Sequence, residues 1–307
     1  MLVNLCPFFK RKFYFVLYTL AILISCIFFS CDQSSLKKNA YEPTFSTDST
    51  NKKVLKWGVP TRGYYEMEEP LVNYLNRKLK NIRIQIIASN TLEDFLVRLR
   101  KKEFDITIHN GLAALEQEQN GYTIVGKIAN DDTYRGIILV NKDSVINNFS
   151  DLTGKTISSP GKEALAGHMM PMYFLHQNGV NVKTDFNILN LGSFESVILN
   201  VYQGNCSAGF CMLSMWNDFI KKRPEIKSRV ELKWTTPALP NLALIFRNDM
   251  EVKVSEELKA FIFSISNATA EGKKVLETLG GTPLVPANTS TYYPMKKFIK
   301  EYNSIFQ

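Results

Sequence analysis

Short apolar segments alternate with amphipathic segments along the chain from residue 54 onward. Residues 54–59 (VLKWGV) and 82–87 (IRIQII) predict strands, and residues 69–79 between them place their leucines and a tyrosine on one helical face. Thr91 is suited to cap a second helix, and residues 104–108 (FDITI) predict a third strand. This strand–helix–strand–helix–strand order, over roughly 55 residues, predicts a parallel sheet covered by helices.

The same order repeats farther along the chain. The predicted strands there are residues 136–140, a turn-and-strand unit at 149–158, and residues 186–189, 207–212 and 242–246; the predicted helices are about 166–178, 194–203, 255–270 and 271–279. Since the strand at 242–246 follows the second set of elements, we expect it to return to the first set.

These patterns predict an α/β protein with two lobes, each a mostly parallel sheet flanked by helices, and a ligand cleft between the lobes. Residues 54–140 plus 241–303 are predicted to form lobe 1, and residues 141–236 to form lobe 2. Ligands of such sheets bind beyond the carboxyl ends of the strands, so the segments that follow the first three strands are expected to face the cleft.

The first 31 residues differ from the rest. A basic run, Lys10-Arg11-Lys12, precedes the uncharged, mainly apolar residues 13–29, and Ser30-Cys31 comes next. This order describes a secretory signal, and the cysteine makes it resemble the signal of a bacterial lipoprotein. The resemblance implies cleavage before Cys31 and attachment of a diacylglycerol to its sulfur. The polar residues 32–52 are then predicted to be a flexible tether.

Two alternatives to this interpretation stay open. Cys26 fits the lipoprotein pattern better at the third position before the cysteine, but cleavage there would expose Ile27, Phe28 and Phe29, so Cys31 is preferred. The segment 13–29 also approaches the lower length limit of an uncut transmembrane anchor.

Composition predicts an exported globular body. The 307 residues are 45% hydrophobic and 21% charged, with a net charge of +8. Removing residues 1–31 removes three basic residues and no acid, so 8 − 3 leaves about +5, a balance compatible with an anionic ligand. No basic cluster with interleaved aromatics follows the signal, so nucleic-acid binding is not predicted.

Few residues in the sequence suggest catalytic or metal-binding chemistry. Cys206 and Cys211 are expected to be buried thiols, and His109, His168 and His176 are not grouped with them as metal ligands would be. We therefore predict neither a metal nor a cofactor. The nucleophile-elbow, zinc-protease and phosphate-loop motifs are absent from the sequence, so an enzyme is not predicted.

Five segments in a fixed order give a family resemblance. They are Trp57–Pro60; Phe104–Thr107 leading to Asn110-Gly111; Thr133–Val140; Asp151–Thr156 followed by Gly167-His168 and Pro171; and Gly280-Gly281 through Val285-Pro286 to Tyr293-Pro294. With these, residues 54–298 resemble the phosphonate-, phosphite- and phosphate-binding members of the type II periplasmic binding proteins, the solute receptors of ABC importers. The resemblance implies a small-molecule ligand, an ABC transporter permease as partner, and a membrane-anchored lipoprotein in the cell envelope, facing the periplasm or cell exterior. A ligand sensor that signals to a kinase or receptor is the alternative.

One departure from the family concerns the ligand. The family's Ser-Thr-Ser loop, which holds anionic oxygens at a helix N-terminus, is replaced by Ala164-Leu165-Ala166. The backbone N–H groups remain, but each lost hydroxyl is expected to weaken a simple phosphonate by roughly 1 kcal/mol or more. Glu195 matches a family acid that binds an amino group. Together these residues predict a zwitterionic or larger anion.

The resemblance also implies further ligand contacts. Tyr64 and Tyr65 follow the first strand, where the family places an aromatic against the ligand, and Tyr134 leads the crossing strand. Asn110 and His168 are the remaining candidates. Each candidate also has a purely structural explanation. Tyr64 and Tyr65 could be exposed tyrosines in a loop, Tyr134 could pack at the hinge, and Asn110 could be part of an Asn-Gly turn. His168 could pack or cap a helix, and Glu195 could be an acid that interacts with the dipole at the start of its own helix.

Overall fold

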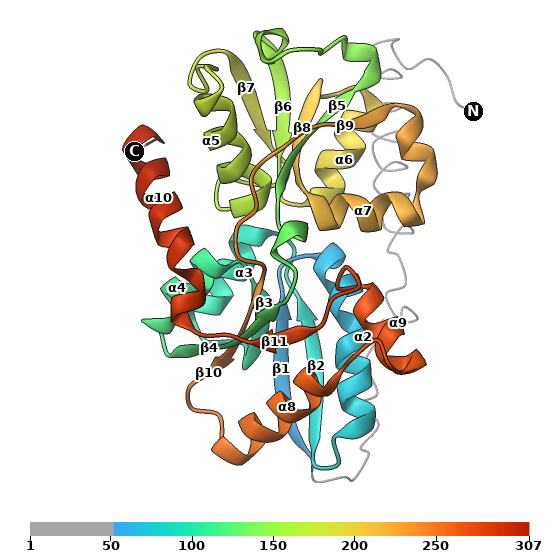
Figure 1. Ribbon diagram of the computed structural model, residues 1–307, viewed down its shortest axis with the longest axis vertical. Coiled ribbons are helices and arrows are strands. Elements are labelled where there is room, and N and C mark those ends of the chain that lie inside the picture. The colour runs from blue at the N-terminus through green and yellow to red at the C-terminus, as the bar shows by residue number, and fades with distance from the viewer. Residues whose placement is uncertain (1–51, 307) are drawn as a thin grey trace, which may run out of the picture. The chain divides into compact units, whose positions relative to one another are not determined.

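Two β-sheets organise residues 52–306, the part of the chain that the structure, a computed structural model, describes (Figure 1). The lobe 1 sheet has the strand order β11 (Leu284–Pro286), β4 (Tyr122–Ile128), β10 (Ala243–Arg247), β3 (Ile106–His109), β1 (Lys53–Val59) and β2 (Ile82–Ala88). The lobe 2 sheet has the order β7 (Phe186–Asn190), β6 (Lys155–Ser159), β8 (Ala208–Met212), β5 (Gly136–Asn141) and β9 (Val230–Thr235). The predicted two-lobed α/β fold is confirmed.

The sheets are mixed and not mostly parallel as predicted. Parallel pairing joins β1 to β2 and β3, and β6 to β7 and β8, whereas β10 is antiparallel to β3 and β4, and β5 is antiparallel to β8 and β9. The register pairs Ala243 with His109 and Gly136 with Met212. Each crossing strand therefore enters its new sheet from the cleft end, where the neighbouring strands finish, and must run in the opposite direction.

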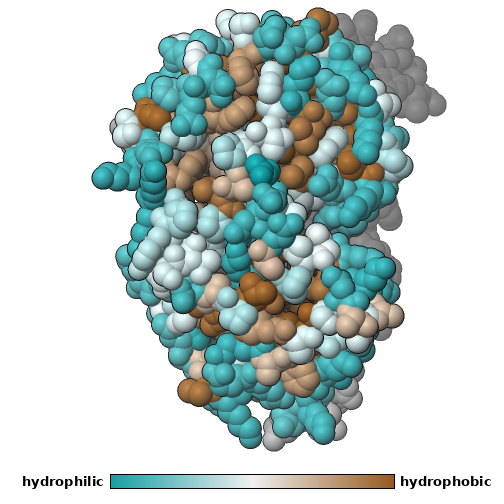
Figure 2. Space-filling model, viewed as in Figure 1, coloured by the Kyte–Doolittle hydropathy of each residue, from teal (hydrophilic) through white to brown (hydrophobic). Residues whose placement is uncertain are grey.

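Helices cover the faces of both sheets (Figure 1). Lobe 1 carries α2 (Arg62–Lys78), α3 (Leu92–Arg100), α4 (Gly111–Glu118), α8 (Val252–Ser264) and α9 (Ala270–Glu277), and lobe 2 carries α5 (Met170–Gln177), α6 (Phe194–Gln203) and α7 (Leu213–Lys222). A π-helical turn, Leu165–Met169, leads into α5. The face in Figure 2 is largely hydrophilic, with smaller hydrophobic areas on both lobes, in keeping with apolar side chains directed towards the sheets.

Helix α2 begins at Arg62 and not near residue 69 as predicted. Its buried stripe starts at Tyr64 and continues through Met67, Leu71 and Leu75, which is the spacing of one helical face. The prediction placed the two tyrosines in a loop because the apolar positions were counted only from Leu71. Tyr64 and its neighbour therefore belong to the first turn of the helix.

The lobe boundaries also differ from the prediction. Strand β5 belongs to the lobe 2 sheet, so the first crossing lies near residues 133–135 and not after residue 140. The C-terminal helix α10 (Tyr293–Phe306), predicted as part of lobe 1 up to residue 303, reaches lobe 2: the Tyr173 hydroxyl donates to Glu301 at 2.7 Å, and Tyr302 joins a buried cluster of lobe 2. Figure 1 shows α10 running from beside α4 towards α5. This helix makes a third connection between the lobes.

A buried acid lies in the core of lobe 1. Glu68 of α2 is fully buried, and Trp57 of β1 donates its indole N–H to one carboxyl oxygen. Burial raises the pKa of Glu68 well above its usual value, and the Trp57 hydrogen bond only partly opposes this shift. Burial therefore favours the protonated, neutral form of Glu68 over the carboxylate.

Across residues 52–306, no helix combines the length and the apolar character needed to cross a bilayer. Cys31, Cys26 and the predicted signal and tether lie outside the described residues, apart from Lys52 at the end of the tether.

Candidate functional site

A small cavity lies between the lobes, where strand ends and helix starts from both sheets meet. Its volume is about 20 Å³, enough for about one water molecule, so an anion of phosphonate size can enter it only if the lobes move apart. Its lining comprises Pro60, Thr61, Tyr64, Leu92, His109 and Asn110 from lobe 1, Tyr134 at the crossing, and Pro160, Ala164, Leu165, Ala166, Gly192, Ser193, Phe194 and Met212 from lobe 2. Because several of these residues directly follow β1, β3 and β6, the cavity occupies the usual ligand position of α/β sheets.

His109, one of the lining residues, carries a neutral hydrogen-bond donor. Its Nδ1 accepts the backbone N–H of Asn110 at 2.7 Å, so the proton of the neutral ring is assigned to Nε2. Burial lowers the pKa of His109 to about 3, and the side chain is 2% exposed. Within the described chain its Nε2 has no hydrogen-bond partner. A ligand oxygen in the cavity would satisfy this donor.

Thr61 offers a second unpaired group from the same lobe. It stands at the N-cap position of α2, yet its side chain makes no capping hydrogen bond. Its Oγ1 is buried and, among residues 52–306, unpartnered. A buried polar atom without a partner costs about 1–3 kcal/mol, which an oxyanion at this position would recover.

Asn110 and the two cavity tyrosines complete the polar lining of this side. Asn110 caps α4 by accepting the Ala113 N–H at 2.9 Å. Burial raises the pKa of Tyr64 well above its usual range, with Tyr134 as the next contributor, and burial likewise raises that of Tyr134. Both phenols are therefore protonated at neutral pH and able to donate.

Lobe 2 contributes backbone and small side chains. Ala164 precedes the π-helical turn, whose first N–H groups point out of the helix start and lack intrahelical acceptors. The N–H of Ala166 lies near the Tyr134 hydroxyl and partly offsets the rise in that residue's pKa. Gly167 permits close packing, since a Cβ there would lie 2.5 Å from the Phe194 ring. The turn thus brings peptide dipoles, and not hydroxyls, to the cavity.

Six of the predicted site residues are brought together here: Tyr64, Asn110, Tyr134, Ala164, Leu165 and Ala166. The structure places three others elsewhere. The Tyr65 hydroxyl bonds Glu69 at 3.1 Å, and the His168 Nδ1 lies 3.0 Å from the Ser159 hydroxyl. Burial lowers the pKa of His168 to about 4. Glu195 lines a different pocket.

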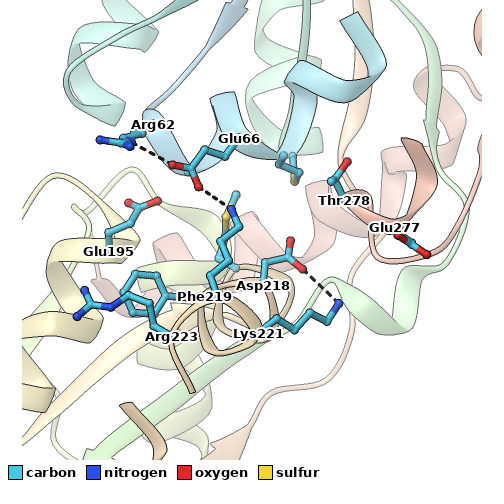
Figure 3. Close-up of a pocket in the computed structure, with 13 residues that line it drawn as sticks. Arg62, Glu66, Glu195, Asp218, Phe219, Lys221, Arg223, Glu277 and Thr278 are labelled. Atoms are coloured by element: carbon cyan, nitrogen blue, oxygen red, sulfur yellow. Dashed lines mark hydrogen bonds and ion pairs between the residues drawn. The ribbon is translucent and has the colours of Figure 1, made fainter. Parts of the chain in front are cut away.

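That second hollow, the rim pocket, is lined by Arg62, Gly63, Glu66, Met67, Glu195, Met215, Asp218, Phe219, Lys221, Lys222, Arg223, Glu277 and Thr278 and has a volume of about 870 Å³. Figure 3 shows α2 on one side of it and residues of α6 and α7 on the other. Glu66 bonds Arg62 at 3.0 Å and, across the lobes, Lys222 at 2.5 Å. The Lys222 hydrogen bond is the main cause that lowers the pKa of Glu66. The rim pocket is larger, but the strand ends converge on the smaller cavity, which we take as the candidate ligand site.

Sequence reasoning missed Thr61 and His109 as site residues. Both stand at strand ends, a signal that could have found them, because the segments following the first three strands were expected to face the cleft. Within residues 52–306, no three His, Cys, Asp or Glu side chains are grouped closely enough to hold a metal ion.

The sequence matches the family profile described as "ABC transporter, phosphonate, periplasmic substrate-binding protein" over residues 61–292. It is 24% identical over 285 residues to the Prochlorococcus marinus (strain MIT 9301) protein named "Probable ABC transporter phosphite binding protein PhnD1", covering 86% of this chain and 93% of that protein. It is 22% identical over 236 residues to the "Phosphonates-binding periplasmic protein" of Escherichia coli (strain K12), covering 74% and 69%.

Two solved structures share the fold. PhnD1 from Prochlorococcus marinus (MIT 9301) in complex with methylphosphonate has a TM-score of 0.73 at 22% identity and covers 82% of this chain and 98% of that one. The binding protein component of an ABC phosphonate transporter from Pseudomonas aeruginosa has a TM-score of 0.75 at 19% identity, with coverage of 83% and 88%. The family profile spans most of both lobes and the cavity between them, so the chain belongs to the phosphonate-binding periplasmic substrate-binding proteins of ABC transporters.

Proposed function

We propose that this protein is a solute receptor without enzymatic activity, which captures a small phosphonate-class anion between its lobes and delivers it to the permease of an ABC importer. One observation carries the proposal. Two buried groups without a partner in the described chain, His109 Nε2 and Thr61 Oγ1, belong to residues that line the same inter-lobe cavity. The structure of the relative PhnD1 in complex with methylphosphonate supports the ligand class.

The chemistry of the cavity favours an oxyanion. Its polar groups are the imidazole N–H, the hydroxyls of Thr61, Tyr64 and Tyr134, and the N–H groups at the start of the π-helical turn. All of these can donate hydrogen bonds, and helix N-termini add a favourable dipole for negative charge. Hydrogen bonds to a charged group contribute about 1.5–3 kcal/mol each, so two or three side-chain donors can replace the hydroxyls that the family's Ser-Thr-Ser loop would supply.

Titration calorimetry with methylphosphonate, phosphite, phosphate and methanesulfonate tests the proposal. We expect the wild type to bind at least one of the phosphorus oxyanions. His109→Phe, which keeps an aromatic ring but removes the donor, and Thr61→Val are each expected to weaken that binding by roughly tenfold or more. Tyr65→Phe, outside the cavity, serves as the control and should leave it unchanged. Full affinity in both donor variants would contradict the proposed site.

Membrane attachment is a separate part of the proposal. We propose that Cys31 carries the lipid and that residues 32–52 tether the two lobes to the membrane, on the strength of the basic–apolar–Ser-Cys pattern. The tether would hold the receptor at the periplasmic or outer face of the membrane, within reach of a permease.

A further inference from the structure

Helix α2 has no negative charge of its own at its N-terminus. Within the described chain, this 17-residue helix has no acidic residue in its first turn, and Thr61 at the N-cap makes no side-chain capping bond. The first N–H groups of a helix have no intrahelical acceptor, and the helix dipole places partial positive charge there. The start of α2 is therefore an uncompensated positive end that faces lobe 2.

Glu195 of lobe 2 brings a carboxylate next to that helix start. Its Oε1 atom lies 1.8 Å from the point where a Cβ on Gly63, the second residue of α2, would stand. Only a glycine allows the carboxylate to approach the helix start so closely. Figure 3 shows Glu195 across the rim pocket from Arg62 and Glu66 of α2.

The position of Glu195 is fixed by its own helix. Ser193 caps α6 by accepting the Ser196 N–H at 3.1 Å, so the first turn that carries Glu195 is held in place. The contact with α2 can form only when the lobes meet. A second inter-lobe contact, between Lys222 and Glu66, lies in the same pocket.

The cavity itself offers no other site for a cation. Its lining, as the structure describes it, contains no acidic side chain. Glu68, the buried acid of lobe 1, is not among the lining residues, and its carboxyl group accepts the indole N–H of Trp57. A ligand amine seated with its anion in the cavity would therefore have to compete with helix α2 for the carboxylate of Glu195.

We infer that Glu195 is a closure residue, which caps helix α2 of the opposite lobe when the cleft shuts, and that the ligand is consequently a phosphonate-class anion without a cationic amine. This inference rests on the proposed function and narrows it. It replaces the zwitterionic ligand that the sequence favoured, because the acid expected to bind the amine lies against the start of α2 and not in the cavity lining.

Titration calorimetry with ethylphosphonate and 2-aminoethylphosphonate, which differ by one amine, tests the inference. We expect the wild type to bind ethylphosphonate at least as tightly as its aminated analogue. Glu195→Gln should weaken both ligands by the same factor, about two- to fivefold, because it removes the charge at the helix start and leaves the cavity intact. Glu277→Gln, a rim-pocket acid on the far side, is the matched control and should alter neither affinity.

A preference for the aminated ligand would overturn this inference but leave the proposed function intact. If the wild type prefers 2-aminoethylphosphonate by tenfold or more, and Glu195→Gln weakens only that ligand, then Glu195 binds the amine. Unchanged affinity for both ligands in Glu195→Gln would remove the closure role. Binding of neither phosphonate by the wild type would instead overturn the proposed function, and the ligand class with it.

Discussion

Substitution of Gly63 by alanine is expected to weaken ligand binding without lowering the stability of the protein. The new Cβ would stand 1.8 Å from Glu195 Oε1, a distance that no non-bonded pair tolerates. Glu195 must then rotate away from the start of α2, or the lobes must remain slightly apart. Either response removes the interaction of the carboxylate with the helix dipole, which is worth about 0.3–1 kcal/mol. Because that interaction exists only in the closed form, its loss appears as a Kd for methylphosphonate that is about two- to fivefold weaker.

The same change should not destabilise lobe 1. Gly63 lies within α2, and replacing a helical glycine by alanine stabilises a helix by up to about 1 kcal/mol. We therefore expect urea unfolding of the ligand-free protein to show equal or greater stability, while calorimetry shows weaker binding. Asn73→Ala is the matched control: it raises helix propensity at an exposed position of α2 and should leave affinity unchanged.

Two results would refute this reasoning. Wild-type affinity in Gly63→Ala would show that the carboxylate contributes nothing to closure. A loss of stability together with a loss of affinity would show that the glycine serves the fold of lobe 1 instead.

Three further predictions follow from other contacts. Lys222→Met removes the inter-lobe ion pair with Glu66; the side chain of Lys222 is 57% exposed and that of Glu66 is 38% exposed. Methylphosphonate binding should therefore weaken by up to about fivefold at low salt, and the affinity of the variant should approach that of the wild type near 1 M salt. Lys221→Met should show no such effect. Burial raises the pKa of Glu68 in the folded protein above its value in the unfolded chain, so the contribution of this carboxyl group to stability is complete below about pH 4.3 and is lost as the pH rises. In urea unfolding over pH 4–8, the stability of the wild type relative to Glu68→Gln should therefore fall by at most about 1.4 kcal/mol per pH unit, and a difference that does not change with pH would contradict this. Cys31→Ala should abolish labelling by a palmitate analogue, and continued labelling would point to another cysteine.

Local signals made much of the fold predictable. The helix at 194–203 was predicted with the bounds that α6 shows, and Thr91 caps α3 by accepting the Asp94 N–H at 3.1 Å as expected. The sheet to which each strand belongs was harder to predict from the sequence. Strand β5 was predicted as a strand but given to the wrong lobe, because pairing with β8 and β9 depends on residues far along the chain.

The candidate site was predictable only where it follows strand ends. Asn110 and the segment Ala164–Ala166 were found from the family's motifs, and the structure places them at one cavity. The unpaired state of His109 depends on burial and on which ring nitrogen accepts the Asn110 N–H, and neither is visible in a sequence. The environment of Glu195 depends on a missing Cβ at Gly63 in the other lobe, a contact that no local pattern encodes.

A crystal structure of the protein grown with methylphosphonate would show where the anion binds. We expect the phosphonate group in the inter-lobe cavity, with oxygens about 3 Å from His109 Nε2 and Thr61 Oγ1 and a further oxygen facing the N–H groups after Ala164. A phosphonate bound instead in the rim pocket, among Arg62 and Lys222, with His109 and Thr61 still unpaired, would contradict it.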